Sequence, residues 1–344
     1  MKKKVSKNFA WTCISLMLAF LTIRSVMKLN RDMSIKDIIA ILKTANPFFL
    51  ILGVVASLLY IWFEGVALTS ILKRSGYKMK PLGGLIYSTS DVYFSAITPS
   101  ATGGQPASAF FMMRDGIPAG VTTATLVLNL AMYTISAIVL GIISLIISPG
   151  AFMTFSRISR DLIILGTVVL TTLTVGFILL LRNDKIVFRP LTKLISFLYD
   201  KKIIKEKEKK LARLDKAKTD YKSCAALIAS SKRVLFWAFF WNFLQRASQT
   251  LVPMLVYISL GGDSSKAPEV FSRQCLITIG YNTVPIPGGM GVSDYLMING
   301  FGSVMNERMA YVVEIVSRGF TFYICVLLSG LITLAGYLYG RNKK

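Results

Sequence analysis

Histidine is absent from this chain of 344 residues, and acidic residues are scarce, since 17 Asp and Glu stand against 40 Lys and Arg. The lack of histidine removes the commonest metal ligand and the commonest proton acceptor near neutral pH. The cysteines, Cys13, Cys224, Cys275 and Cys325, are scattered and form no CxxC motif. We read them as small apolar residues, and we expect no metal site, cofactor or disulfide.

Long apolar runs dominate the chain instead. Hydrophobic residues make up 53% of it, and its mean hydropathy is +0.58. Several runs exceed the roughly 20 residues that cross about 30 Å of hydrocarbon. They predict an all-α polytopic membrane protein with one membrane domain, 1–344. The net charge of +23 lies beside the predicted spans, so anionic lipid head groups are the expected partner, and nucleic acid is not.

Six full spans are predicted, at 9–26, 47–72, 118–148, 162–181, 234–260 and 308–340. A signal peptide is the alternative for the first span, but no small-residue cleavage site follows it, and Arg24 and Lys28 close it. Apolar residues in 34–44 recur at helical spacing, which predicts a short helix at the membrane interface.

Two breaks rich in glycine and proline interrupt the apolar pattern, TPSATGGQP at 98–106 and PIPGGMG at 285–291. The apolar arms beside the first break are too short to cross a bilayer at about 1.5 Å per residue. We therefore expect re-entrant hairpins within 82–113 and 267–306. Backbone without helical hydrogen bonds is costly in lipid, so protein or water should surround both tips. The alternative is that both breaks are ordinary connecting turns.

The windows 47–148 and 233–340 have the same order of span, broken hairpin and span. The segment 182–233 holds 16 Lys and Arg. All basic segments, and both termini, fall on the cytoplasmic side only if both hairpins are re-entrant. The two windows then have opposite orientations, which predicts an inverted-topology repeat. The basic connector 182–233 either lies on the anionic cytoplasmic leaflet or serves only to fix the topology.

Ionisable residues in or beside apolar segments are costly and usually face a cavity. Glu314 and Arg318 are four residues apart and can pair on one helix. Arg246 has no acidic residue in its span, so it is the first candidate for a lipid phosphate and Arg318 the second. Structural ion pairs, such as Glu64 with Arg246, are the alternative. The residues of this kind are Glu64, Asp91, Arg246, Asp294, Glu314 and Arg318.

Two hairpin tips that meet near the membrane midplane would create a polar site. Glycine allows tight turns and close approach of a ligand, and helix N-termini after paired glycines offer N–H groups to phosphate. We assign no catalytic or metal-binding role to the tips. Their candidate lipid-binding residues are Thr98, Pro99, Gly103, Gly104, Gln105 and Pro106 in the first and Pro285, Pro287, Gly288, Gly289, Gly291 and Asp294 in the second.

The segments TPSATGGQPASAFFMMRDGI and PIPGGMGVSD resemble the paired motifs of a known family. One motif is Pro, then Gly-Gly-Glu-Pro, then an Arg; the other is Pro-Gly-Gly-x-Gly-x-x-Glu. The family is the transmembrane region of lysylphosphatidylglycerol synthases, which is the flippase domain of the bacterial multiple peptide resistance factor and also occurs as stand-alone proteins. The resemblance covers nearly the whole chain. It also implies that Arg114 is a candidate lipid-binding residue. Gln105 stands where the family often has Glu, and Ser293-Asp294 where Arg-Glu is common, which favours a different head group.

The resemblance implies movement of an aminoacylated or other anionic phospholipid between the leaflets of a bacterial-type plasma membrane. The chain stops four residues after its last predicted span, so we do not expect the soluble aminoacyltransferase domain of full-length family enzymes. No GxxxxGK[ST] motif is present, so transport would draw on an ion, voltage or lipid gradient.

The alternatives to a lipid translocase are three functions, and the oligomeric state is a separate question. An enzyme would transfer lysine from lysyl-tRNA to phosphatidylglycerol with Glu64, Asp91 or Asp294 as base. A scaffold would recruit a separate lipid synthase through 182–233. A transporter of soluble molecules and a homodimer stay open.

Overall fold

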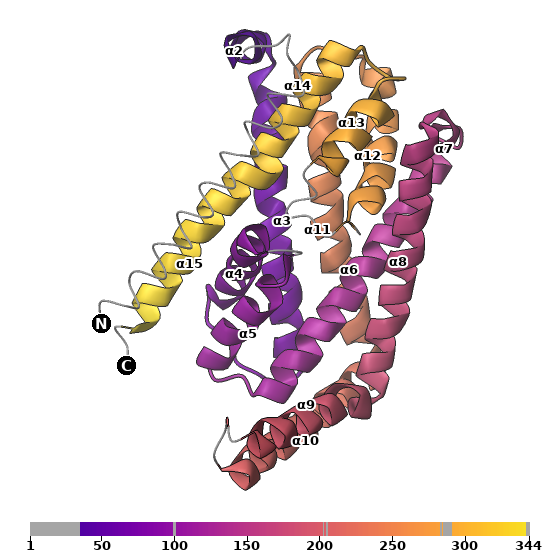
Figure 1. Cartoon of the computed structure of the whole chain (residues 1–344). Coiled ribbons are helices and arrows are strands. Elements are labelled where there is room, and N and C mark those ends of the chain that lie inside the picture. Colours follow the sequence, from indigo (N-terminus) through magenta and orange to yellow (C-terminus); the bar gives the residue numbers. More distant parts are fainter. Residues whose placement is uncertain are drawn as a thin grey trace.

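A computed structural model describes residues 35–98, 101–201, 203, 206–282, 284 and 291–341 of the chain. These residues form helices joined by short turns, and no strand occurs among them (Figure 1). The predicted all-α class is confirmed. The predicted span 9–26 and nearly all of the break 285–291 lie outside the described residues.

The first hairpin follows a long helix. The elements are α2 (Ile35–Thr44), α3 (Pro47–Arg74), α4 (Gly83–Ile97), α5 (Gly104–Arg114) and α6 (Ala119–Ile147). Helix α2 matches the short helix predicted over 34–44. Helix α3 begins where the Asn46 side chain accepts the Phe48 N–H at 3.0 Å, which is a typical N-terminal cap. The open end of the α4–α5 hairpin is closed by Asp115, which accepts from the Tyr87 hydroxyl at 2.8 Å and from Lys80 at 2.5 Å.

The middle of the chain contains one long helix that runs back along the bundle and two helices that lie across one end of it. It comprises α7 (Ala151–Thr154), α8 (Arg157–Arg182), α9 (Asp184–Asp200) and α10 (Lys207–Ser230). Figure 1 shows α9 and α10 lying across the lower end of the helical bundle. The next helix leaves α10 at an angle of 88°. The basic segment 182–233 is therefore largely helical.

The second half repeats the order of long helix, short pair and long helix. It comprises α11 (Lys232–Ser259), η2 (Ser264–Lys266), α12 (Ala267–Tyr281), α13 (Val292–Phe301), α14 (Glu307–Arg318), η4 (Gly319–Ile324) and α15 (Cys325–Arg341). The last span was predicted over 308–340, and the segment Glu307–Tyr339 is long and apolar enough to cross a membrane. This segment contains the π-helical turn η4 directly after Arg318, and such turns often occur at functional sites.

Four described helical segments are long and apolar enough to cross a membrane, namely α3, α6, α8 and Glu307–Tyr339. The bent pair of α10 and α11 gives a fifth if it counts as one span. The predicted number of six stays a prediction because 9–26 is not described. Helices α4 and α12 have 15 residues each, α5 has 11 and α13 has 10, which is too short to cross at about 1.5 Å per residue.

The two short pairs lie in opposite halves of the bundle. Figure 1 shows α4 and α5 in its lower half and α12 and α13 in its upper half. Each pair belongs to its own large apolar cluster. Leu72, Tyr87 and Met112 belong to the lower cluster, and Val256, Ile277 and Leu296 to the upper one. This arrangement is consistent with an inverted repeat, which remains a prediction.

Candidate functional site

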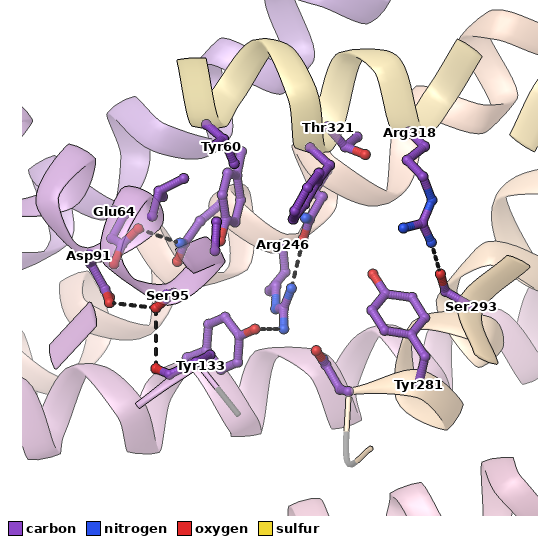
Figure 2. A pocket seen from close by; sticks show the side chains of 18 of the residues that line it. Tyr60, Glu64, Asp91, Ser95, Tyr133, Arg246, Tyr281, Ser293, Arg318 and Thr321 are labelled. Atoms are coloured by element: carbon purple, nitrogen blue, oxygen red, sulfur yellow. Dashed lines mark hydrogen bonds between the residues drawn. The ribbon is translucent and has the colours of Figure 1, made fainter. Parts of the chain in front are cut away.

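A cavity of about 520 Å³ is lined by residues of both short helix pairs and of the long helices around them (Figure 2). Most of the residues that line it have polar or charged side chains, although they lie on apolar helices. The charged residues that line it are Glu64, Asp91, Arg246 and Arg318. The main uncharged polar residues are Tyr60, Ser95, Gln105, Asn129, Tyr133, Gln245, Gln249, Gln274, Tyr281, Ser293 and Thr321.

The acidic wall consists of Glu64 on α3 and Asp91 on α4, which lie close together in Figure 2. The Gln245 amide donates to Glu64 Oε2 at 3.3 Å, and the Ser88 hydroxyl lies 3.2 Å from the same oxygen. The Gln105 amide donates to Asp91 Oδ2 at 2.7 Å. The first break thus contributes Gln105 to the cavity, as a donor to an acidic residue.

Arg246 on α11 forms the first basic site and is 2% exposed. Its Nη1 donates to Gln249 Oε1 at 2.7 Å and its Nη2 to the Tyr133 hydroxyl. The guanidinium also lies over the Tyr133 ring, 3.6 Å from the ring centroid. Among the described residues, Nε has no hydrogen-bond partner and no carboxylate lies within ion-pair distance of the guanidinium.

The predicted alternative for Arg246 was an ion pair with Glu64. No such pair occurs within the described part of the chain, because Glu64 accepts from Gln245 and Arg246 donates to Gln249 and Tyr133. Within the described residues, the guanidinium therefore donates hydrogen bonds only to uncharged groups and lies over an aromatic face.

Arg318, at the end of α14, forms the second basic site and is 7% exposed. Its Nε donates to Glu314 Oε1 at 3.1 Å, which confirms the pair predicted from their spacing. Its Nη2 donates to Asp294 Oδ1 and to the Ser293 hydroxyl, so the arginine is bound to α13. Nη1 has no partner among the described residues. Arg318 is thus paired with two carboxyl groups but still keeps one free donor.

Asp294 joins the start of α13 to this site. Its Oδ2 accepts the Gly291 N–H at 3.0 Å, which caps the helix, while Oδ1 accepts from Arg318. Gly291 has a φ of +82°, a conformation that glycine adopts at little cost. Neither Asp294 nor Glu314 lines the cavity. Both hold the arginine that does.

Other predicted site residues shape the first hairpin or lie elsewhere. The Thr98 hydroxyl accepts the Gly103 N–H at 2.8 Å. Gly104 lies directly against Asp91 and Ser95. Arg114 donates to the Gly336 carbonyl at 2.9 Å, which is away from the cavity. Thr98, Gly103, Pro106 and Gly291 are not among the residues that line the cavity, and Pro99, Pro285, Pro287, Gly288 and Gly289 lie outside the described residues.

A polar stripe on α11 was missed from the sequence. Asn242, Gln245, Arg246 and Gln249 follow one another at intervals of three, one and three residues, so they share one face of the helix. Three of them line the cavity, and Asn242 donates to Asn129 on α6 at 2.9 Å. The sequence signal that could have revealed this stripe is the spacing of its polar residues, which recur at helical intervals inside an apolar span.

A third buried arginine, Arg273 on α12, was also missed and has a different environment. It donates to Glu269 at 2.6 Å, to the Thr154 hydroxyl at 2.8 Å and to the Gly300 carbonyl at 2.8 Å. It does not line the cavity. Its contacts join α12 to the end of α13 and to α7.

For metal binding, the described residues contain no group of three His, Cys, Asp or Glu side chains that would suit an ion.

The family comparison agrees with this architecture. No curated protein matches the chain. A family model described as "Lysylphosphatidylglycerol synthase TM region" matches residues 9–329, which is nearly the whole sequence. The chain therefore belongs to the family of lysylphosphatidylglycerol synthase transmembrane regions, a family of membrane proteins associated with lysylphosphatidylglycerol metabolism or transport.

Proposed function

We propose that the protein is a lipid translocase that passes the head group of an anionic or aminoacylated phospholipid through the cavity between its two short helix pairs. Arg246 is the observation that carries the proposal. A charged residue at the centre of a membrane helix costs about 2.5–3.5 kcal/mol on insertion scales. Within the described residues, no carboxylate lies within ion-pair distance of the Arg246 guanidinium. A phosphate bound in the cavity would offset the cost by direct contact with the guanidinium.

The free donors in the cavity suit a phosphate. Arg246 Nε and Arg318 Nη1 are buried and unpartnered among the described residues, and both arginines line the same cavity. Hydrogen bonds between charged groups are roughly twice as strong as neutral ones. Gln245 and Gln274 each present a buried amide oxygen that has no partner in the described chain. These amides would replace water around the remaining polar groups of the lipid.

The acidic wall offers a place for an amine. Glu64 and Asp91 line the cavity together with two basic residues, Arg246 and Arg318, and neither carboxyl group forms an ion pair within the described chain. An ammonium group on an aminoacylated head group would be attracted to them. The lipid tails would stay in the bilayer while the head group passes along the polar walls.

Alternating access would arise from movement of one short pair and its neighbours relative to the other. The two short helix pairs belong to separate apolar clusters, so one pair could shift while the packing within the other is kept. Segment η4 adjoins the cavity through Thr321 and Phe322 and is a natural point for α14 and α15 to change their relative angle.

The test is translocation of fluorescent phosphatidylglycerol in proteoliposomes, measured by chemical quenching of the outer leaflet. We compare wild type with Arg246→Gln and Arg318→Gln. The matched control is Arg308→Gln, which removes an exposed arginine from the same helix as Arg318. Loss of a charged hydrogen bond of about 1.5–3 kcal/mol predicts a rate that is roughly 10 to 100 times lower for Arg246→Gln. Equal rates for wild type and both cavity variants would rule out this site.

Glu64 and Asp91 also support a second candidate, lysyl transfer to phosphatidylglycerol with a cavity carboxylate as base. Purified protein is incubated with lysyl-tRNA and phosphatidylglycerol, and lysyl-lipid is sought by mass spectrometry. Product that disappears in Asp91→Asn but persists in Arg308→Gln would favour the enzyme. Translocation without product favours the translocase.

A further inference from the structure

The apolar face of α9 is wider than the surface that covers it. Phe188, Ile195 and Leu198 lie on the side that is buried or half-buried. At 100° per residue, Ile186, Leu194 and Phe197 fall on the adjoining side of the same apolar face. These three side chains are 46%, 50% and 56% exposed. Neighbouring helices therefore cover only part of this face.

The covered side of α9 is firmly held. The Phe188 ring packs against Tyr221 of α10, with ring centroids 5.5 Å apart. The Tyr221 hydroxyl donates to the Leu180 carbonyl of α8 at 2.8 Å. At the start of α9, Asp184 pairs with Lys218 and Lys222, each at 3.6 Å. The exposed apolar row is thus presented in a fixed orientation.

A basic row borders the exposed apolar row. Lys185, Arg189 and Lys193 are spaced four residues apart, so they lie above one another on α9. All three are exposed, and none forms an ion pair within the described part of the chain. An apolar row beside a row of long basic side chains is the pattern of a helix that lies in a membrane interface.

We propose that α9 is a binding surface for anionic phospholipids and lies in the head-group layer beside α8. Ile186, Leu194 and Phe197 would enter the acyl boundary, and the basic row would contact lipid phosphates. The unpaired positive charges favour an anionic lipid surface over a second copy of this chain, whose matching row is equally basic. The proposal does not depend on translocase activity.

The first experiment measures where α9 lies in vesicles. A spin label is attached to Leu194→Cys in the full chain, with the native cysteines replaced by alanine, in vesicles of phosphatidylcholine with and without phosphatidylglycerol. The control label replaces Arg213, an exposed residue of α10. We expect the label at 194 to be more accessible to oxygen than to a water-soluble nickel complex, and the label at 213 to show the reverse. A water-like response at 194, or broadening from a second label nearby, would overturn the proposal.

The second experiment tests the preference for anionic lipid. Lys185, Arg189 and Lys193 are changed together to Gln, and Lys209, Lys210 and Lys216 of α10 serve as a control with the same loss of charge. Each basic residue near an anionic surface contributes roughly a fivefold preference. In wild type, we expect the oxygen accessibility of the label at 194 to rise when phosphatidylglycerol is added to the vesicles. The variant of α9 should lose this increase, and the control variant of α10 should keep it. An increase of the same size in both variants would refute the assignment to anionic lipid.

Discussion

Substitution of Gly104 by Ala provides a direct test of the first hairpin, because this position admits no side chain. A Cβ atom there would lie 1.8 Å from Asp91 Oδ1, 2.0 Å from Ser95 Oγ and 2.8 Å from the Asp91 carbonyl oxygen. Real Cβ contacts essentially never fall below 3.0 Å. The carboxylate of Asp91 must move, and α5 must also withdraw from the α4 backbone.

The expected cost follows from two effects. Inserting one carbon into a packed contact costs about 1–3 kcal/mol. The shift also disturbs the 2.7 Å hydrogen bond from Gln105 to Asp91, and a hydrogen bond to a charged group contributes about 1.5–3 kcal/mol. The total is a loss of roughly 2.5–6 kcal/mol, which corresponds to a decrease in Tm of at least about 5 °C at roughly 2 °C per kcal/mol.

Thermal unfolding in one detergent, followed by tryptophan fluorescence, measures this loss. The matched control is Gly176→Ala on α8, where a Cβ would meet no atom within 4 Å. That substitution should raise stability by up to about 1 kcal/mol, since alanine is the better helix former. A Gly104→Ala protein that unfolds at the wild-type temperature, beside a control of normal behaviour, would show that the close contact between α4 and Gly104 does not exist.

The buried arginines and their partners give two further predictions. Arg273→Gln should lower the free energy of unfolding by about 3–5 kcal/mol because it breaks a buried network of hydrogen bonds and an ion pair. Arg246→Gln should change the free energy of unfolding by less than about 1 kcal/mol or raise it. Chemical denaturation of both variants in the same detergent measures the difference. For Asp294→Asn and Arg318→Gln, a double-mutant cycle should give a coupling energy of roughly 0.5–3 kcal/mol, and strictly additive losses would contradict the ion pair between α13 and α14.

Local patterns made much of the fold predictable. The Asn46-Pro47 pair marks the start of α3, and the spacing of Glu314 and Arg318 gives their contact. Glycine and proline interrupt helices where they occur in such density, and the helices flanking the two breaks end at Ile97 and Tyr281 and begin again at Gly104 and Val292. Each of these features depends on residues a few positions apart, so one sequence is enough to find it.

Contacts between distant segments were not predictable in this way. Arg246 donates to the Tyr133 hydroxyl on α6 as well as to Gln249 on its own helix, and no periodicity in α6 or α11 identifies the contact between these two helices. In the sequence, Arg273 has only Glu269 as a nearby charged partner. In the structure, the Thr154 hydroxyl and the Gly300 carbonyl also accept hydrogen bonds from it. Arg114 contacts α15 carbonyls rather than the cavity. Which charge faces a cavity and which is fully bonded depends on how the helices pack.

Arg246 and Arg273 therefore serve as an internal comparison of function with stability. Each is about 2% exposed, so desolvation costs both of them alike. Arg273 recovers that cost through a carboxylate, a hydroxyl and a carbonyl, whereas the described partners of Arg246 are uncharged and leave Nε free. Folding alone gives no reason to keep a cation at position 246, because a glutamine could bond to Tyr133 or Gln249 without the charge. A ligand that brings negative charge into the cavity does provide a reason to keep the cation. Such a ligand should raise the Tm of wild type while leaving the Tm of Arg246→Gln nearly unchanged.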